Sequence, residues 1–538
     1  MQGTLSFLFA FVYLLSLPLL RATTYHATPG DYKSFITRLQ PGDTLLLGEG
    51  IYVDRLRLVD VVGEEAAPIV ISGPQDGKEA VFLGNACCNT VSLIRCAYVT
   101  ISYLTIDGKH INYVDAVKAE GNSGNWTHHI TLHHLRIIHH GPEQQTVGIS
   151  TKCPSWDWHI HHNTIIGAGT GMYLGNSNGE EAFVNGLIEY NLIMNTTGYN
   201  LQIKRQNDRT RTTPGMPQRG RTIIRYNTFV KEEDVPGNSA RPNLLVGAFP
   251  STTAGKDDMY EIYGNFFWQN QTEKLFQGTG NLAFHHNILI NKYPDGGGIQ
   301  IQEHHGRKPQ RIYIFQNTIW TKGRSIFFYR PDPAYKQIVN GNAVFSDRGI
   351  KNAPIKMDNI EHGYDQVGDY LVSPSQDITS CVMTPKEDKL YGYRINHALY
   401  DGLEDAAYGF GGRKETWRRR GAYASCCHPD WQLDKSIRTP VVKEGTTHVF
   451  PGGGNQPEVL RLLGNPIGSH QPIVWTSSVP VRRVRLIDTR GRTVFSRVFP
   501  RPRVGLISIP PSDLHPGMYL LVCETERGVQ VLTVMVGR

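Results

Sequence analysis

Five side chains in the middle of the chain have the types needed to move a proton beside a bound anion. Lysine, histidine and carboxylate groups accept or deliver protons, and arginine pairs with a carboxylate or stabilises developing negative charge. Each of the five follows a short, largely apolar strand pattern, at the point where a turn begins. The candidate catalytic residues are Lys204, Arg205, Glu303, His304 and Arg330.

A second set of polar and aromatic residues occupies alternate positions on, or directly after, the same short strands. Because successive side chains of a strand point to opposite faces, these residues are expected on one outer face, next to the catalytic candidates. Tyrosine rings stack on sugar rings, whereas amides and lysine bind hydroxyl and carboxylate groups. A lone outward Gln or Lys is ordinary on any surface, but the combination favours a binding surface for an acidic polysaccharide. The candidate substrate-binding residues are Lys152, Tyr173, Gln202, Gln300, Gln302 and Tyr329.

The elements that must position these residues recur along the chain as an asparagine phrase between two short strands. Its asparagines are Asn163, Asn191, Asn227, Asn265, Asn287, Asn317 and Asn342. Their unequal spacing fits the coils of a solenoid in which one turn accepts insertions. Asparagine tolerates a left-handed backbone and bonds to neighbouring backbone groups, so we expect Asn191, Asn227 and Asn287 to stack in one ladder. The pattern predicts an all-β fold, a right-handed parallel β-helix over residues 25–435.

The strands that carry the candidates also predict the interior of this solenoid. A two-residue period directs one set of apolar side chains inward, coil upon coil. This set is Ile149, Met172, Leu201, Leu244, Leu275, Ile299 and Ile326. With Leu275 inside, Phe276 is expected on the outer face.

The start of the solenoid resembles a known enzyme class. The phrases LQPGDTLLLGEGIY and PIVISG, within residues 29–85, resemble the opening of polysaccharide lyases of the chondroitinase B and alginate lyase type. This resemblance implies a pectate-lyase-like solenoid in which a lysine is the base, an arginine assists, and calcium held by acidic residues neutralises the substrate carboxylate. Lys204 then corresponds to the base, and Arg205, or Arg330 two strands further on, to the assisting residue.

Calcium is the one cofactor that the resemblance implies, and no metal ligand is assigned. The paired glutamates Glu180–Glu181 and Glu232–Glu233 fall in turns instead of the expected coil. Repeated histidine pairs such as His133–His134 and His161–His162 are expected to stack between coils, since no carboxylate accompanies them as a third ligand.

Two other functions fit the same scaffold. A β-helix glycoside hydrolase needs clustered carboxylates, for which Asp257–Asp258 and Glu303 are the nearest matches. A non-catalytic glycan-binding surface protein or adhesin would carry a similar wall of polar side chains. The net charge of +7 is spread thinly over 538 residues and argues against a nucleic-acid partner.

The beginning of the chain predicts export. Phe7 to Leu20 is a mainly apolar run of the length of a signal-peptide core, which places a signal peptide at residues 1–24. No later stretch is apolar enough to cross a membrane, so the mature protein is expected to be secreted or held at the cell surface.

The end of the chain predicts a separate module. After a linker at 436–455, residues 456–538 show short β-hairpin patterns that suit a small β-sandwich. This module resembles the C-terminal sorting domain of the type IX secretion system of Bacteroidetes-like bacteria, and the resemblance implies that this machinery is a partner. It is carried by Gly464-Asn465-Pro466, Asp488-Thr489-Arg490-Gly491-Arg492, Leu514–Tyr519 and Val534–Arg538.

Overall fold

The computed structural model divides into two compact units, Met1–Thr446 and Thr447–Arg538, which are described separately. It describes residues 22–444 except 76, 123, 208, 210–214, 233–239, 427–430 and 442. In the second unit it describes 460–463, 467–468, 473–488, 493–509, 517–525 and 528–537. Most of the expected signal peptide, residues 1–21, lies outside these ranges. No helix in the described ranges is long and apolar enough to span a membrane.

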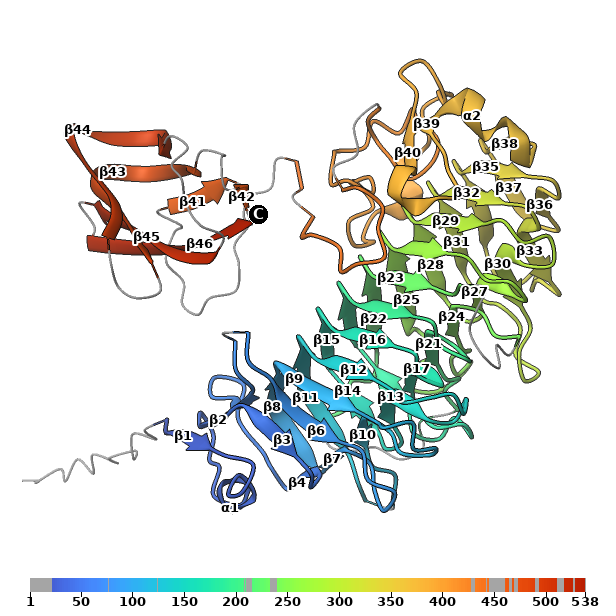
Figure 1. The fold of residues 1–538 in the computed structure, drawn as a ribbon. Coiled ribbons are helices and arrows are strands. Elements are labelled where there is room, and N and C mark those ends of the chain that lie inside the picture. Colours follow the sequence, from blue (N-terminus) through green and yellow to red (C-terminus); the bar gives the residue numbers. More distant parts are fainter. Residues whose placement is uncertain are drawn as a thin grey trace, which may run out of the picture. The chain divides into compact units, whose positions relative to one another are not determined.

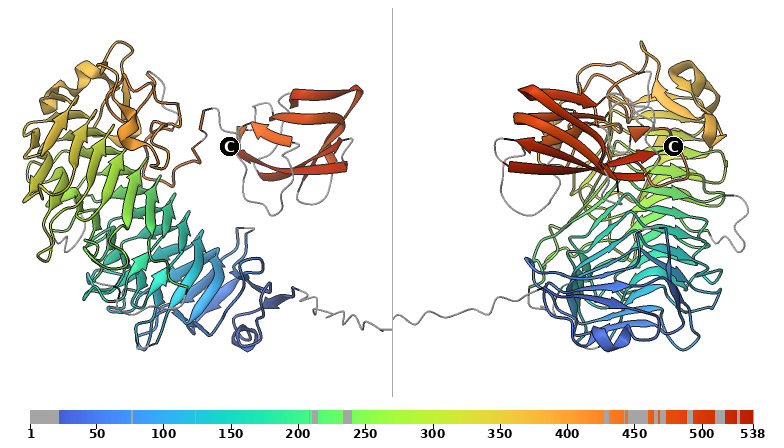
Figure 2. Two further views of the ribbon diagram at one scale, coloured as in Figure 1. Left: turned by 180° about the vertical axis from the view of Figure 1, so that it is seen from behind. Right: turned by 60° about the vertical axis from the view of Figure 1, so that its left-hand side comes forward.

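The first unit is a right-handed parallel β-helix, as predicted, whose coils stack along one axis (Figures 1 and 2). Each coil gives one strand to each of three parallel sheets. Sheet 1 contains β1 (Thr24–Ala27), β2 (Thr44–Leu47), β5 (Ile69–Ser72), β8 (Cys96–Ser102), β11 (Thr127–His133), β15 (His159–His161), β19 (Leu187–Glu189), β22 (Arg221–Arg225), β25 (Met259–Tyr263), β28 (Leu282–His285), β31 (Ile312–Phe315), β34 (Gln337–Asn340) and β37 (Ile355–Met357). The short β14 (Ser155–Trp156) pairs with β11, and β18 (Phe183–Val184) pairs with β14.

The other two sheets follow sheet 1 in every coil. Sheet 2 contains β3 (Gly50–Tyr52), β6 (Ala80–Leu83), β9 (Leu104–Asp107), β12 (Arg136–Ile138), β16 (Thr164–Ile166), β20 (Leu192–Met194), β23 (Thr228–Val230), β26 (Phe266–Trp268), β29 (Ile288–Asn291), β32 (Thr318–Thr321), β35 (Ala343–Ser346) and β38 (Ile360–His362). Sheet 3 contains β4 (Leu56–Val59), β7 (Val91–Ile94), β10 (Val117–Ala119), β13 (Val147–Thr151), β17 (Thr170–Leu174), β21 (Leu201–Ile203), β24 (Leu244–Val246), β27 (Lys274–Gly278), β30 (Gly297–Gln302), β33 (Arg324–Tyr329) and β36 (Ile350–Lys351). The short helix α1 (Lys33–Ile36) packs Ile36 against the first coils.

The predicted asparagine ladder is confirmed at the turn between sheets 1 and 2. The side-chain amide of Asn191 donates to Oδ1 of Asn227 at 2.9 Å, and Asn227 donates to Asn265 at 3.0 Å. The same bond links Asn163 to Asn191 and continues through Asn287, Asn317 and Asn342. The preceding residue is left-handed, for example Tyr190 at φ +52° and Tyr226 at φ +57°. The ladder therefore satisfies buried amides while it turns the chain.

Replacing Asn265 by alanine is expected to destabilise the solenoid. Oδ1 of this fully buried side chain accepts a bond from the backbone nitrogen of Asn227, and its Nδ2 donates to the carbonyls of Ile224 and Tyr263, so the variant leaves these buried groups without that partner. Each such group costs about 1–3 kcal/mol of unfolding free energy. Urea unfolding measures the loss, with the exposed Asn122→Ala as control. Equal midpoints for the two variants would contradict a stabilising ladder.

The register of sheet 3 corrects one part of the predicted interior. Phe276 aligns with Leu244 and Ile299 and is buried in the core, so its expected outward position is wrong. Gln277 takes the outward position beside Gln300. Leu275 is buried as well. Where three consecutive side chains are all buried, inward and outward positions do not differ in burial. A two-residue period therefore cannot give the register of this strand.

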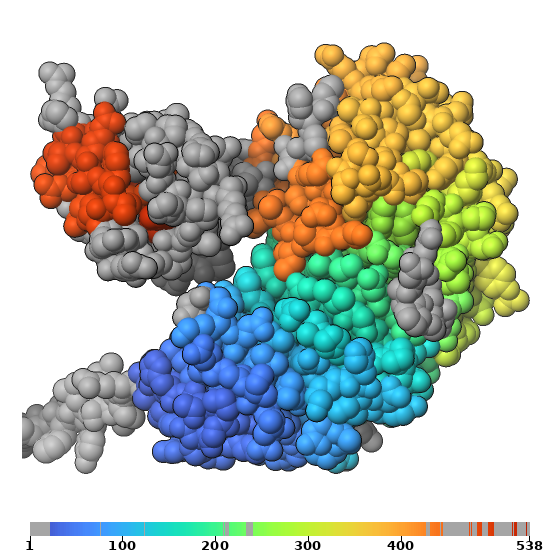
Figure 3. Space-filling view, viewed as in Figure 1, coloured from blue at the N-terminus to red at the C-terminus, as the bar shows by residue number. Residues whose placement is uncertain are grey.

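Residues 363–426, 431–441 and 443–444, together called the cover segment, pack on the outer sides of sheets 1 and 2 over the later coils (Figure 3). The Tyr400 ring stacks on Phe315 with centroids 3.7 Å apart, and Trp417 packs beside them. The segment contains η1 (Tyr364–Gln366), α2 (Val367–Tyr370), β39 (Leu371–Ser373), η2 (Ile378–Ser380), β40 (Val382–Pro385) and η3 (His397–Tyr400). It thus shields the flat outer faces of both sheets from water.

A buried polar network fixes the cover segment to sheet 1. Oδ2 of Asp405 accepts hydrogen bonds from the hydroxyls of Tyr226 (3.0 Å) and Tyr263 (2.9 Å). The Arg225 guanidinium donates to Glu189 at 2.6 Å and lies 3.6 Å from Asp405, and Lys443 pairs with Asp405. The negative charges of Glu189 and Asp405 are therefore balanced by the positive charges of Arg225 and Lys443 across this contact.

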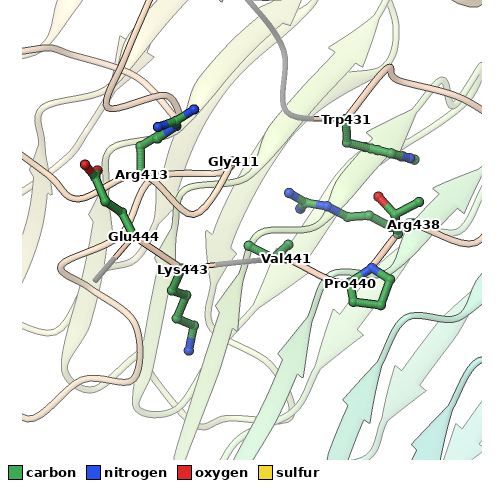
Figure 4. Close-up of a pocket in the computed structure, with 9 residues that line it drawn as sticks. Gly411, Arg413, Trp431, Arg438, Pro440, Val441, Lys443 and Glu444 are labelled. Atoms are coloured by element: carbon green, nitrogen blue, oxygen red, sulfur yellow. The ribbon is translucent and has the colours of Figure 1, made fainter. Parts of the chain in front are cut away.

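A hollow of about 350 Å³ lies within the cover segment beside this network (Figure 4). Arg413, Lys443 and Glu444 stand on one side and Trp431 and Arg438 on the other. The buried Arg438 guanidinium donates to the carbonyls of Gly264 and Phe410 and lies over the Phe410 ring. Arg438 consequently acts as a second attachment of the segment to the solenoid.

The second unit is a small β unit whose strands form one hydrogen-bonded sheet, antiparallel except for the parallel pair β42–β46, which is compatible with the expected β-sandwich. Its strands are β41 (Leu460–Leu463), β42 (Ile467–Gly468), β43 (Ile473–Asp488), β44 (Thr493–Ile509), β45 (Gly517–Thr525) and β46 (Gly528–Gly537). The long β43 pairs with β41 through its first half and with β45 through its second half, with register shifts between them. Trp475, Leu486 and Leu521 are among its buried core. The expected sorting motifs at 464–466, 489–492 and 514–516 lie outside the described residues.

Cysteine pairing is local. Cys87 and Cys88 form a disulfide between neighbouring residues. Cys96 and Cys381 are buried thiols, and burial raises the pKa of each to about 11. These two residues therefore act as core side chains.

Candidate functional site

The outward residues of sheet 3 form a continuous column, which we call the outer wall. Hydrogen-bonded register places Ser150 beside Tyr173 and Tyr173 beside Gln202, and further along it places Gln277 beside Gln300. A second column two residues later in each strand contains Lys152, Lys204 and Gln302. With strands about 4.8 Å apart, the wall from β13 to β30 is about 24 Å long. The wall is therefore long enough for several sugar units of an extended chain.

Two lysines share one tyrosine ring near the β13 end of the outer wall. Nζ of Lys152 lies 3.4 Å from the centroid of the Tyr173 ring, and Nζ of Lys204 lies 5.5 Å from it. All three residues were predicted from sequence as catalytic or substrate-binding, and the structure brings them together. Figure 1 shows the stacked strands β13, β17 and β21 that place them on successive coils.

The environment of these lysines favours the neutral amine. Burial lowers the pKa of Lys152 to about 7, and the positive charges of Lys118 and Lys204 act in the same direction against the attraction of Asp115. Burial and the neighbouring Arg205 charge lower the pKa of Lys204. A base is most effective when its pKa lies near the working pH. Near neutrality one lysine can accept a proton while the other stays positive.

Tyr173 remains protonated between the two lysines. Burial raises the pKa of its hydroxyl, while a hydrogen bond with Ser177 and the charge of Arg205 partly oppose that effect. A protonated phenol beside two amines is a candidate proton donor. Lys152, Tyr173 and Lys204, together called the lysine site, therefore combine a base, a cation and an acid.

The turn that follows β30 folds back toward β21. The Arg307 guanidinium donates to the carbonyls of Gln206 (2.7 Å) and Phe249 (3.0 Å), and His304 pairs with Arg307 through their backbones. Burial lowers the pKa of His304 to about 4, with added repulsion from His305, Lys204 and Arg205. His304 thus faces the lysine site as a neutral imidazole, although its strand is three positions away.

Arg205 is oriented by a neighbouring turn. Its guanidinium donates to the carbonyls of Ser177 (3.2 Å) and Asn178 (3.0 Å). Its charge acts on Lys204, Tyr173 and His304 at the same time. Arg205 therefore contributes to the field of the site from one edge.

Arg330 does not belong to the lysine site. The sequence interpretation put it two strands from Lys204, but β33 is four strands from β21, about 19 Å away at ordinary strand spacing. Arg330 lies 3.7 Å from Glu303 and 5.3 Å over the exposed ring of Tyr329. The predicted pair Glu303 and Arg330 therefore stands at the far end of the outer wall. The inward residues Leu201, Leu244, Leu275, Ile299 and Ile326 already lie on five successive strands, so the interval of two strands was a counting error.

The predicted amides form a separate group on that half of the wall. Gln300 donates to Gln302 at 2.5 Å, and Gln302 donates to Gln277 at 3.5 Å. Gln202 is buried on the lysine side. Gln277 was not predicted as a site residue, because the register of β27 was assigned incorrectly. Aligning Gln277 with Gln300 would have identified it.

The acidic residues nearest the lysines do not suit calcium. Asp115 lies 3.3 Å from Lys118, and Glu303 is paired with Arg330. Calcium needs six to eight oxygen ligands, usually several of them carboxylates. Among the described residues, no group of three or more His, Cys, Asp or Glu side chains could hold a metal ion. The acidic residues around the lysines therefore give no basis for a reaction step that involves calcium.

The predicted stacking of histidines is confirmed on sheet 1. The rings of His133 and His161 stack with centroids 4.9 Å apart, and those of His134 and His162 with centroids 5.2 Å apart. Burial, reinforced by neighbouring histidines, lowers the pKa of His133 to about 4 and that of His161 to about 2. The stack is therefore neutral in the folded chain.

This stack predicts acid sensitivity. The unfolded chain takes up protons near the ordinary histidine pKa of 6.5, whereas the folded stack does so only near pH 4 and below. Stability is consequently constant above pH 6.5 and is lost as pH falls from there toward 4. His161→Gln should reduce the fall in Tm between pH 7 and pH 5, and the exposed His26→Gln should leave it unchanged. The same fall in both variants would contradict this assignment.

Comparison with known proteins finds similarity in structure alone. No protein-family model matches the chain, and no curated protein matches its sequence. A mutant of the PL6-family alginate lyase AlyGC is similar at 13% identity, with 83% of this chain and 61% of that chain covered and a TM-score of 0.45. An alginate lyase from a Paenibacillus species has 13% identity, coverage of 61% and 99%, and a TM-score of 0.36.

A hydrolase is similar to a comparable degree. The GH136 lacto-N-biosidase from Eubacterium ramulus has 12% identity, coverage of 63% of this chain and 68% of that chain, and a TM-score of 0.41. At such identities, residue roles must come from the side chains of this protein. By the pairing of its own sheets, the chain is a right-handed parallel β-helix protein.

Proposed function

We propose that this protein is a polysaccharide lyase that cleaves an acidic glycan by β-elimination. The observation that carries the proposal is the arrangement of Lys152 and Lys204 against the Tyr173 ring, both with lowered pKa. Elimination from a uronic acid requires a base for the C5 proton, a cation for the carboxylate and an acid for the leaving oxygen. The lysine site supplies one group for each need.

In the proposed reaction, the neutral amine of one lysine removes the proton from C5. The other lysine, still an ammonium, pairs with the substrate carboxylate and stabilises the negative charge that develops on it. The electron pair then forms the C4=C5 double bond as the C4–O bond breaks, and the Tyr173 hydroxyl protonates the leaving oxygen. His304 and Arg205 border this site, and Gln277, Gln300 and Gln302 are available to hydroxyl groups further along the chain of sugars.

Product analysis tests the reaction class. The purified protein is incubated with alginate, chondroitin, heparin and pectin, and the absorbance of the C4=C5 double bond is compared with the release of reducing ends. The proposal expects both signals to rise together on at least one substrate. Reducing ends without the absorbance would indicate a hydrolase instead, and binding without either signal would indicate a glycan-binding adhesin.

We also propose that the protein is exported and sorted by the type IX system, on the strength of its end sequences. Deleting residues 456–538 in a host that has this machinery is expected to leave the β-helix inside the cell envelope, whereas the full chain reaches the surface or the medium. Immunoblots of cell fractions measure the difference. Equal surface delivery of both chains would contradict the assignment.

A further inference from the structure

A second polar pocket lies away from the outer wall, where the long turns enter sheet 1. It has a volume of about 480 Å³ and is bounded on one side by the cover segment. Its charged and aromatic lining includes Arg219, Arg221, Arg311 and Tyr313. None of the outer-wall residues lines it, so it is a distinct site on the first unit.

The positive charges of this pocket are only partly compensated. Within the described chain, the exposed Arg219 guanidinium forms no ion pair. Arg311 lies 3.6 Å from Asp257, with both side chains about half exposed. Arg221 is held by Glu261 and by the carbonyl of Gly402, each at 2.9 Å. The remaining acid of the lining, Asp401, lies 3.7 Å from His397.

The rest of the lining suits a ring. Met259, Tyr313, Leu399 and Leu403 are partly buried and pack against the aromatic core under the cover segment. Asn281 is buried beside the pocket, where its Oδ1 accepts hydrogen bonds from the backbone and the side chain of Arg311. An apolar floor with a few convergent polar groups is the usual form of a small-ligand site.

We propose that this pocket binds a small anionic sugar, with a carboxylate or sulfate held by Arg219 and Arg311 and the ring packed on Tyr313. Guanidinium groups match both anions through paired N–H bonds, and aromatic faces accept the apolar side of a sugar ring. Because the pocket shares no residue with the lysine site, binding there is independent of the proposed elimination.

Calorimetric titration of the full chain with digalacturonate, a sulfated disaccharide and uncharged maltose tests the proposal. At least one anionic sugar should bind, and maltose should not. Arg219→Ala and Arg311→Ala should each weaken binding about 10-fold or more, which is the usual effect of losing a charge-assisted hydrogen bond. Arg219→Ala removes an exposed side chain, and Arg311→Ala removes a half-exposed ion pair and one of the two hydrogen bonds that Arg311 donates to Asn281 Oδ1, so the variants are expected to fold. Arg136→Ala, an exposed arginine on sheet 2, is the matched control.

The lysine variants separate this site from the outer wall. Lys204→Met removes a cation of the outer wall and should keep the binding to the pocket that Arg219→Ala and Arg311→Ala weaken. Loss of binding in Lys204→Met with retention in both arginine variants would place the ligand on the outer wall and overturn the proposal. Absence of binding by either anion, or equal binding of maltose, would also overturn it.

Discussion

Methionine in place of Lys152 or Lys204 is expected to reduce the rate of glycan cleavage by about 10²–10⁴-fold, the usual contribution of a positioned acid or base. Each change removes one of the two amines that share the Tyr173 ring and leaves the apolar part of the side chain. The double variant should lose little more than either single one, because residues that act as a unit are not additive. Initial rates of double-bond formation measure the effect.

The control for this prediction is Lys351→Met, which changes an exposed lysine on the last strand of the same sheet. It should leave the rate unchanged. The unchanged protein should gain activity as pH rises through about 7, because the base must lose its proton first. Full activity in both Lys152→Met and Lys204→Met, with normal folding, would remove the lysines from the mechanism.

Replacing Arg225 by methionine is expected to cost about 3–5 kcal/mol of unfolding free energy, the usual result of removing one partner from a buried ion pair. Its guanidinium donates to Glu189 and to the Tyr263 hydroxyl, and lies close to Asp405 of the cover segment. His159 and Arg225 lower the pKa of Glu189 to about 2 in spite of burial, so Glu189 stays ionised and would lose one of its two partners. Urea unfolding followed by fluorescence measures the change.

Arg136→Met is the matched control, since Arg136 is exposed on sheet 2. Adding Glu189→Gln to Arg225→Met should restore part of the stability, because a neutral amide costs less to bury than a carboxylate that has lost a partner. Limited proteolysis should also cut the cover segment earlier in the single variant. An Arg225 variant as stable as the control would show that other contacts hold the segment.

The regular part of the fold could be predicted because it is repeated. Asparagine recurs at the turn from sheet 1 to sheet 2 for the same structural reason in each coil that carries it. Its seven occurrences were enough to predict the ladder. Phe276 was misplaced because Leu275, Phe276 and Gln277 are all buried and the two-residue period disappears there.

The candidate site was predicted in part. Lys152, Tyr173 and Lys204 lie on adjacent coils in matched register, so strand alternation was enough to bring them together. His304 lies at the site because the turn after β30 folds back toward β21, three strands away. Arg330 lies two coils further from Lys204 than expected. Turn conformation depends on tertiary contacts such as those of Arg307, which local sequence does not encode.

The lysine pair is tested most directly by titrating the lysine side chains of the protein with ¹⁵N-labelled Nζ groups by NMR. The expected result is two Nζ signals that titrate near pH 7, far below the ordinary 10.5: one from Lys152, which is absent in Lys152→Arg, and one from the buried Lys231, which remains. If Lys152→Arg removed no signal that titrates near pH 7, Lys152 would keep its ordinary pKa, and the proposed base would be contradicted.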